Sequence, residues 1–485
     1  MKKENIKFEN KRNLIIKIVI SLIFIFLSGW LFLSVYKLGI IPNKYLIIFA
    51  VILVIVHLIS NLCLFSKKKW LKIFTVILML LLTIVSVFGI KYANDIDNFL
   101  DTSLNNAENK LTIDFVLLSK NNYDEGDLVN KEVYYYNSAL FIDKALAKLN
   151  EKYQVTTKGI DDITKLFDYD IFIMDKTTFY LFVEENGINA DDYYLIDELS
   201  IEYEIDKKEE QTETTNSKND NKKQSDEGDY YNIYLGGYDF SGFRMDLNKI
   251  ITINTKTNEI LITSVHRYTY INIPAYNQKN ILSNTAYYGI NNNIEALEEL
   301  FDIDIDYYVS VKTNGLVSLV DTIGGIEYCS DQAFTTSHAK VIGTYDDTKG
   351  EHVKVKKGCQ HLDGIETLTV AREREAFKMG AVQRDKNTTA IMLDILYQMR
   401  SPENIMNYTS ILNAVGGMYT TSIPREELTE GVKRLLNGGW SIKTQSLSGT
   451  NGRNKIHFSN LIGPVNYPKS SSVEKCSKAI KALEN

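Results

Sequence analysis

The chain is short of cysteine and has no excess of positive charge. Only four cysteines occur in 485 residues, which is too few for a disulfide scaffold. The formal net charge is -7, and this argues against a nucleic-acid binder, because such proteins usually carry a strongly basic domain. The length leaves room for several domains and a large core.

Long apolar runs dominate the first ninety residues. Each run is close to the ~20 residues that a helix needs to cross a bilayer. The runs cover residues 18–36, 45–64 and 73–90. A cleavable signal peptide is not indicated, because the first run lacks a small-residue cleavage site and two more runs follow. We therefore predict a membrane domain of three transmembrane helices over residues 1–92. His57 and Asn61 are expected to face neighbouring helices, with a proton relay as the alternative.

The cations that flank these runs predict the orientation, because cytoplasmic loops are enriched in Lys and Arg. Five cations precede the first run: Lys2, Lys3, Lys7, Lys11 and Arg12. Four lie between the second and third runs: Lys67, Lys68, Lys69 and Lys72. The loop between the first and second runs holds only Lys37 and Lys44. We predict a cytoplasmic N-terminus, a cell-membrane location and extracytoplasmic residues 91–485. Cys329 and Cys359 then lie outside and are predicted to pair, with free or buried thiols as the alternative.

The outer part divides at residues 206–229, which contain no aliphatic or aromatic side chain. Such a segment cannot bury enough apolar surface to offset its ordering entropy, so we predict a flexible polar linker. Before it, residues 93–205 are predicted to form a small α/β accessory domain, with strands over 111–120 and 169–176 and an amphipathic helix over 137–153. No catalytic pair, metal-ligand spacing or phosphate loop is found there, which favours a binding or spacer role.

Residues 230–485 interleave strands with helices, so the predicted class is again α/β, with a central mixed sheet flanked by helices. Strands are predicted over 230–240 and 249–267, the latter with a turn at 254–259. Helices are predicted over 292–303, 387–401 and 425–438, and a helix, a Gly-Gly turn and a strand over 316–329.

Charged residues follow the ends of the first two strands of this domain, where binding sites of α/β sheets often lie. They are Asp239, Arg244, Asp246 and Arg267, and further along come Arg372, Arg374 and Arg384. Carboxylates are hard ligands for a cation such as Mg²⁺, and the arginine fork matches phosphate oxygens. If residues 372–374 are extended, both guanidinium groups point to one side. Surface ion pairs with Glu373 and Glu375 are the alternative.

These segments together resemble one protein family. "YLGGYDFSGFRMD", "SVHRYTYI", "LVDTIGGIEY", "GCQHLDGIETLTVARER" and "QRDKN" occur in the order found in the LytR-CpsA-Psr family, membrane-anchored phosphotransferases of Gram-positive cell-wall assembly. The resemblance covers residues 230–400, and the tail to 485 more loosely. Three membrane helices followed by an accessory domain resemble its capsule-associated branch. The resemblance implies transfer of an anionic glycopolymer, such as capsule or teichoic acid, from a polyprenyl-pyrophosphate carrier to peptidoglycan.

The resemblance also implies a role for each matching residue. Asp239 and Asp246 match the residues that hold Mg²⁺. The pyrophosphate would be bound by Arg244, Arg267, Arg372, Arg374 and Arg384. The residues implied to be catalytic are Arg267, Arg372, Arg374 and Asp246.

The chain departs from the family pattern at several positions. The usual Ser-Ile-Pro-Arg-Asp is here Ser264, Val265, His266, Arg267 and Tyr268, and Ala381 and Thr388 replace an acidic residue and a glutamine. The retained arginines and aspartates favour an enzyme, whereas the substitutions favour a non-catalytic, membrane-tethered regulator that binds lipid pyrophosphate. His266 is a candidate base or, as the alternative, a surface or packed histidine.

Overall fold

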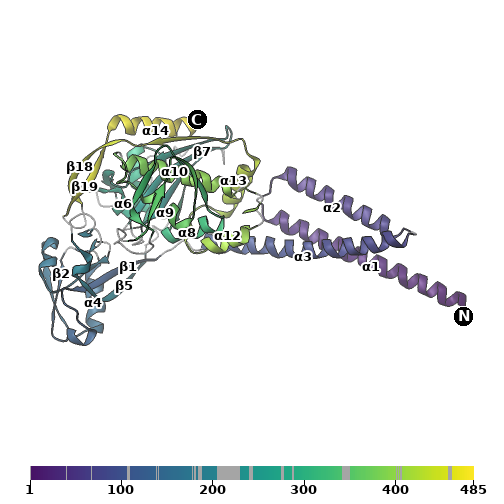
Figure 1. The fold of residues 1–485 in the computed structure, drawn as a ribbon, viewed down its shortest axis with the longest axis horizontal. Helices are drawn as coiled ribbons and strands as arrows, with labels where there is room; N and C mark the ends of the chain where they lie inside the picture. Colours follow the sequence, from purple (N-terminus) through teal and green to yellow (C-terminus); the bar gives the residue numbers. More distant parts are fainter. Residues whose placement is uncertain are drawn as a thin grey trace, which may run out of the picture. The chain divides into compact units, whose positions relative to one another are not determined.

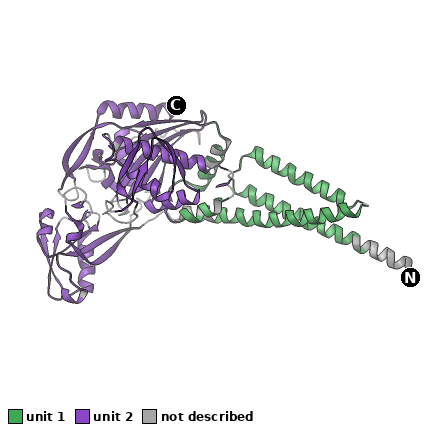
Figure 2. Cartoon of the chain, viewed as in Figure 1, with its two compact units in different colours: residues 1–105, 405–416, 423–439 green, residues 106–404, 417–422, 440–485 purple. Residues whose placement is uncertain are grey.

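The computed structural model describes most of the chain. The described residues are 2–484 except 40, 67, 106–109, 138, 140, 177, 180–181, 184–187, 205–229, 240–243, 275–277, 287–288, 341–349, 379, 400, 402, 405–406 and 457–460. The predicted linker over 206–229 therefore lies outside the described residues. The chain forms two compact units (Figure 2), of which the first comprises residues 1–105, 405–416 and 423–439 and the second residues 106–404, 417–422 and 440–485.

Three long helices make up most of the first unit (Figure 1). They are α1 (Lys2–Lys37), α2 (Asn43–Leu64) and α3 (Lys69–Asn105). Each holds a segment long and apolar enough to cross a membrane, which confirms the three predicted spans; the segments are Leu14–Lys37, Asn43–Leu64 and Lys69–Asn98. Helix α3 continues beyond residue 92, where the membrane domain was predicted to end, so residues 93–105 extend the third helix rather than open an accessory domain.

Polar residues of α2 face α1, as the sequence predicts. Asn61 accepts a hydrogen bond from Ser21 of α1 at 2.7 Å and is hydrogen-bonded to His57 Nε2 at 2.8 Å. The His57 ring stacks on Phe24 of α1 at a centroid distance of 5.4 Å. A polar side chain in a bilayer needs such a partner, because lipid offers none. These contacts join α1 to α2.

Two helices from the C-terminal half of the sequence belong to the same unit. They are α12 (Tyr408–Val415) and α13 (Arg425–Asn437). Leu428 of α13 packs against Leu38, Ala93 and Ile96 at the ends of α1 and α3, and Arg425 forms an ion pair with Asp97. The helix predicted over 425–438 is confirmed, but its packing on α3 is not indicated by the sequence.

A five-stranded sheet follows α3 in sequence, in the order β3-β2-β4-β1-β5. Its strands are β1 (Lys110–Ser119), β2 (Glu132–Tyr136), β3 (Thr156–Ile160), β4 (Ile171–Asp175) and β5 (Tyr194–Glu204). Alternate residues of β1 face opposite sides. Phe115 lies in a core with α4 (Ile142–Lys152), whereas Val116 lies in a core with Phe172. Burial on both faces explains the unbroken apolar run from Phe115 to Leu118 in β1, and the predicted α/β character of this region is confirmed.

A six-stranded mixed sheet forms the centre of the C-terminal region, as predicted. Its order is β16-β11-β6-β7-β8-β17, with parallel pairing of β11 with β6 and of β17 with β8 and antiparallel pairing elsewhere. The strands are β6 (Tyr230–Tyr238), β7 (Met245–Asn254), β8 (Glu259–Ser264), β11 (Tyr307–Val311), β16 (Tyr419–Thr421) and β17 (Ser441–Ser446).

Helices cover both faces of the mixed sheet. Residues Tyr234 and Ile250 point to a core shared with α6 (Leu282–Thr285), α7 (Ile290–Phe301) and α14 (Ser470–Glu484). Lys249, next to Ile250, points to the other face and donates a hydrogen bond to the Thr389 hydroxyl. On that face lies α10 (Gly380–Gln398), which contacts α9 (Gly364–Arg372), and α9 in turn contacts α8 (Thr313–Thr322).

Four short strand pairs surround this sheet. They are β9 (Tyr270–Ile273) with β10 (Gln278–Ile281), β12 (Ile326–Ser330) with β15 (Gly358–Leu362), β13 (Phe334–Ala339) with β14 (His352–Val355), and β18 (Gly449–Ile456) with β19 (Leu461–Pro468). Cys329 and Cys359 lie opposite each other in β12 and β15 and form a disulfide, which confirms the predicted pairing. Cys63 and Cys476 are free.

Candidate anion-binding site

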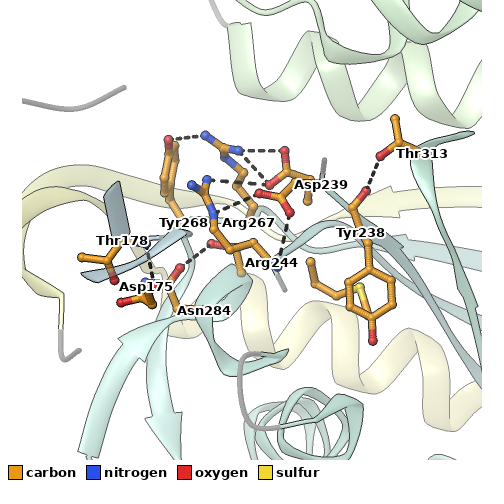
Figure 3. Close-up of polar contacts among 12 residues, drawn as sticks. Asp175, Thr178, Tyr238, Asp239, Arg244, Arg267, Tyr268, Asn284 and Thr313 are labelled. Atoms are coloured by element: carbon orange, nitrogen blue, oxygen red, sulfur yellow. Dashed lines mark hydrogen bonds and ion pairs between the residues drawn. The ribbon is translucent and has the colours of Figure 1, made fainter. Parts of the chain in front are cut away.

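Both predicted aspartates and two of the predicted arginines lie at adjacent strand ends of the mixed sheet. Strand β6 ends at Tyr238 and β7 begins at Met245, so Asp239, Arg244 and Asp246 flank the connection between them. The Asp239 backbone N–H donates to the Arg244 carbonyl oxygen at 2.9 Å, and the Asp239 carboxylate lies 3.7 Å from Arg244 Nε. Figure 3 shows these two residues beside Arg267, which follows the end of β8.

Asp246 is the point at which three arginines meet. Both of its carboxylate oxygens accept hydrogen bonds from Arg267 Nη1 at 2.7 Å. Arg384, from the first turns of α10, donates to the Asp246 carbonyl oxygen at 3.2 Å and lies 4.0 Å from its carboxylate. Arg244 Nη2 lies 4.0 Å from the same carboxylate. Residues far apart in the sequence therefore converge on one aspartate.

The electrostatic balance at Asp246 favours its charged form. Burial alone would raise the pKa of the carboxyl, but Arg267, Arg244 and Arg384 outweigh burial and hold the pKa well below its usual value. The pKa of Arg384 is in turn lowered by burial and by the nearby charge of Arg267. The arginines therefore stay close together partly because one aspartate offsets their repulsion.

Tyr268 joins Arg374 to the same cluster. Its hydroxyl oxygen accepts a hydrogen bond from Arg267 Nη2 at 2.5 Å and another from Arg374 Nη1 at 3.2 Å. The guanidinium carbon of Arg267 also lies over the Tyr268 ring, 4.5 Å from its centroid. Tyr268 is a position where the sequence departs from the family pattern, so its part in the site could not be inferred from the family motif.

Arg372 and Arg374 flank the end of helix α9 rather than lying in a strand. Arg372 is the last residue of α9, and Glu373 caps the helix in an extended conformation. The prediction that Arg372 and Arg374 point to the same side assumed an extended segment. It therefore does not apply, because helical and extended residues direct their side chains differently. Arg372 is half-buried, and its part in the site remains a prediction from the family resemblance.

The segment that carries Arg374, residues 373–378 after α9, is anchored by buried contacts. Glu373 is fully buried, and its carboxylate accepts from the Ser337 backbone N–H and hydroxyl of β13 and from the Ala376 N–H. A Cβ on Gly380 would meet the Arg374 carbonyl oxygen at 2.1 Å, so the start of α10 passes this carbonyl where only glycine fits. Glu373 is therefore a buried anchor, not the surface ion-pair partner considered as the alternative.

Lys249 is a buried cation that the sequence interpretation missed. Its ammonium group donates to the Ser264 hydroxyl at 2.8 Å and to the Thr389 hydroxyl at 2.9 Å. Burial lowers its pKa to about 8, against the opposing effect of the Asp385 carboxylate. A lysine in the apolar strand β7, next to a site predicted to bind an anion, is the signal that could have drawn attention to it.

His266 is better described as a packed histidine than as a catalytic base. Burial and the nearby positive charges of Arg384, Arg267 and Arg374 lower its pKa to about 3. The ring is therefore neutral at physiological pH and a weak proton acceptor. Thr388, another departure from the family pattern, donates its hydroxyl to the Asp385 carbonyl oxygen within α10. The Ala381 side chain lies outside the described part of the structure.

Positive charge predominates in the resulting site. Arg244, Arg267, Arg374 and Arg384 outnumber Asp239 and Asp246 by two. Among the described residues, no group of three His, Cys, Asp or Glu side chains converges to hold a metal ion. A cluster of fixed arginine forks with a net positive charge is suited to an anion with several oxygens, such as a phosphate ester.

The fold is an α/β domain with a cluster of arginines suited to a phosphate-type anion, in a chain that carries helices suited to a membrane anchor. The sequence profile of the LytR_cpsA_psr family matches residues 198–472, which is more than half of the chain. The chain belongs to the LytR-CpsA-Psr family, as the sequence motifs predicted.

Curated relatives are named as teichoic acid transferases. The chain is 29% identical over 174 residues to the "Polyisoprenyl-teichoic acid--peptidoglycan teichoic acid transferase TagT" of Bacillus subtilis (strain 168), covering 36% of this chain and 51% of the relative. It is 24% identical over 195 residues to the corresponding TagU protein of Bacillus mycoides (strain KBAB4), covering 40% of this chain and 60% of the relative. The chain thus spans less than two thirds of the length of these relatives.

Two solved structures match about half of the chain at low identity. "TagT bound to LI-WTA" is 21% identical, with a TM-score of 0.42, and the match covers 53% of this chain and 90% of that one. "Crystal structure of B. subtilis TagU" is 23% identical, with a TM-score of 0.41, and the match covers 53% of this chain and 98% of that one.

Proposed function

We propose that the protein is a membrane-anchored phosphotransferase that moves an anionic glycopolymer from a polyprenyl-pyrophosphate carrier to peptidoglycan on the outer face of the membrane. The observation that carries the proposal is the convergence of four arginines and two aspartates from three separate stretches of sequence. Membership of the LytR-CpsA-Psr family and the transferase names of its relatives support the same reaction class. Three helices able to cross a membrane support an anchor beside a lipid-linked substrate.

In the proposed reaction, a sugar hydroxyl of peptidoglycan attacks the phosphorus that bears the glycopolymer. A new P–O bond forms to that hydroxyl oxygen, the bond to the bridging pyrophosphate oxygen breaks, and prenyl monophosphate leaves. The hydroxyl proton is released to water. Negative charge develops on the leaving phosphate, so positioning and charge stabilisation are assigned the main role and no strong base is assigned. This agrees with the low pKa of both Asp246 and His266.

The arginines are assigned the stabilising role. Arg267, held by both oxygens of Asp246, and Arg384, held at the Asp246 carbonyl, are fixed before a substrate arrives. Preorganised donors of this kind stabilise developing charge without reorganisation during the reaction. Arg372, Arg374 and Arg244 complete the proposed pyrophosphate set.

We further propose that Asp239 and Asp246 hold Mg²⁺. Both aspartates lie against Arg244, so the two carboxylates lie close to one site. Mg²⁺ is commonly bound through one or two carboxylates together with substrate phosphates, and it would supply further neutralisation of the pyrophosphate charge. Since the described residues offer no third acidic ligand, we expect tight Mg²⁺ binding only when the donor is present.

The test is a transfer assay with the purified full chain in detergent, a labelled lipid-pyrophosphate-linked polymer and a peptidoglycan acceptor. Arg267→Ala is expected to reduce transfer ~100-fold, as loss of one preorganised donor typically does. Arg453→Ala is the matched control, because Arg453 is an exposed arginine of β18 that donates to the Ile462 carbonyl oxygen. Near-normal transfer by Arg267→Ala would end the proposal. A wild type that binds the lipid without transferring polymer would favour the non-catalytic regulator.

A further inference from the structure

Tyr268 packs in an apolar cluster. It is buried with Ile281 of β10, Ile456 of β18 and Val465 of β19. Its carbonyl oxygen accepts from the Asn466 N–H of β19 at 2.7 Å. The ring therefore has little freedom to move, and the β18–β19 hairpin supports the position of its hydroxyl.

The hydroxyl is placed between two cations. A tyrosine oxygen can accept two hydrogen bonds, and here it accepts one from Arg267 and one from Arg374. The ring face also lies against the Arg267 guanidinium, which is a favourable cation–π arrangement. Two like charges are thus joined through one hydroxyl oxygen.

We propose that Tyr268 is a positioning residue that holds Arg267 and Arg374 as a pair for the pyrophosphate group. The proposal rests on the function proposed above. The hydroxyl oxygen joins the two guanidinium groups through hydrogen bonds, whereas a carboxylate at this place would offset one of the two positive charges. The pair then offers two forks side by side, which suits a diphosphate more than a monophosphate.

The test compares two prenyl ligands on the purified full chain in detergent. Tyr268→Phe keeps the ring and removes only the hydroxyl. We expect it to weaken binding of geranylgeranyl pyrophosphate about tenfold, the usual scale for one hydrogen bond to a charged group, and to weaken binding of geranylgeranyl monophosphate less. The ratio of the two affinities on one variant is independent of how much of the protein is folded.

Two further variants separate positioning from a structural role. Tyr270→Phe removes a hydroxyl two residues away that contacts only the Lys455 carbonyl oxygen among its described hydrogen bonds, and it is expected to leave both affinities unchanged. In an Arg374→Ala background, Tyr268→Phe should add little, because coupled residues are not additive.

The outcomes are distinct. Equal losses for diphosphate and monophosphate, or full additivity with Arg374→Ala, would overturn the positioning role. A wild type that binds neither ligand would overturn the proposed function itself. Diphosphate-selective loss in Tyr268→Phe, absent from Tyr270→Phe, is the result expected here.

Discussion

Asp246 holds the arginine cluster together, and this gives it a role beyond the metal ligand predicted from the family motif. It binds Arg267 through both carboxylate oxygens and lies near Arg244 and Arg384. Removing one partner of a buried charge cluster leaves the remaining charges uncompensated, which is far more costly than losing an exposed ion pair.

Asp246→Asn is therefore expected to lower stability by about 3 kcal/mol at pH 7. Because the pKa of Asp246 is lowered by folding, the carboxylate stabilises the folded state above about pH 4 and loses this effect as the pH falls through its folded pKa. The difference between variant and wild type should thus shrink below pH 4. Thermal unfolding of both proteins at pH 7, 5 and 3 measures this, and a difference that grows toward low pH would contradict the sign.

At the scale of elements, the disulfide supports the segment that carries Arg374. Cys329 and Cys359 close a loop that contains β13, and Ser337 of β13 binds the buried carboxylate of Glu373. Strand β15, which holds Cys359, leads through the capping residue Asp363 into α9 and so to Arg372. The covalent link therefore restrains both connections to residues 372–374.

The double variant Cys329→Ser, Cys359→Ser is expected to lose about 3 kcal/mol of stability, on the loop-entropy estimate for a loop of this size. Prenyl-pyrophosphate affinity should fall with it, because the Glu373 anchor is loosened. Thermal unfolding and ligand titration under non-reducing conditions give both readings. Unchanged unfolding of the double variant would show that the bridge adds no restraint.

Helix α13 belongs with the membrane helices, and this can be tested by cross-linking. With Cys63 and Cys476 replaced by alanine, Ala93→Cys and Leu428→Cys should form a disulfide on mild oxidation, because both residues lie in one apolar cluster. Arg425→Asp should reduce its yield, and adding Asp97→Arg should restore it by reversing the ion pair. The pair is partly exposed, so an effect of about 1 kcal/mol or less is expected. If the protein that keeps Arg425 and Asp97 forms no cross-link, this packing of α13 on α3 is contradicted.

Features that depend on local sequence could be predicted, whereas contacts between residues far apart in the sequence could not. The three membrane helices could be predicted because length and apolarity are local properties. Asp239, Asp246, Arg267 and Arg384 could be predicted from strand ends and the family motif together. The partner of Glu373 could not, because Ser337 is 36 residues away and neither residue is unusual locally. The hydrogen bonds from Arg267 and Arg374 to the Tyr268 hydroxyl could not be predicted either, because Tyr268 stands where the family motif has an aspartate.

At the scale of the whole molecule, orientation in the membrane is the assumption that the function depends on. The distribution of Lys and Arg predicts a cytoplasmic N-terminus and places residues 91–485 outside. A reporter inserted at Asp220, in the polar segment 206–229, should be active if it is a phosphatase that needs the outer face. A cytoplasmic reporter at the same residue should be inactive. Activity of the cytoplasmic reporter instead would place the arginine cluster on the wrong side for a cell-wall acceptor.

An experimental structure of the full chain with geranylgeranyl pyrophosphate and Mg²⁺ tests the proposed site most directly. We predict that the two phosphates lie among Arg244, Arg267, Arg374 and Arg384, within hydrogen-bond distance of at least two guanidinium groups. We also predict Mg²⁺ between the phosphates and the carboxylates of Asp239 and Asp246. Phosphates bound elsewhere, with this arginine cluster left empty, would contradict the assignment of the site and with it the proposed transfer reaction.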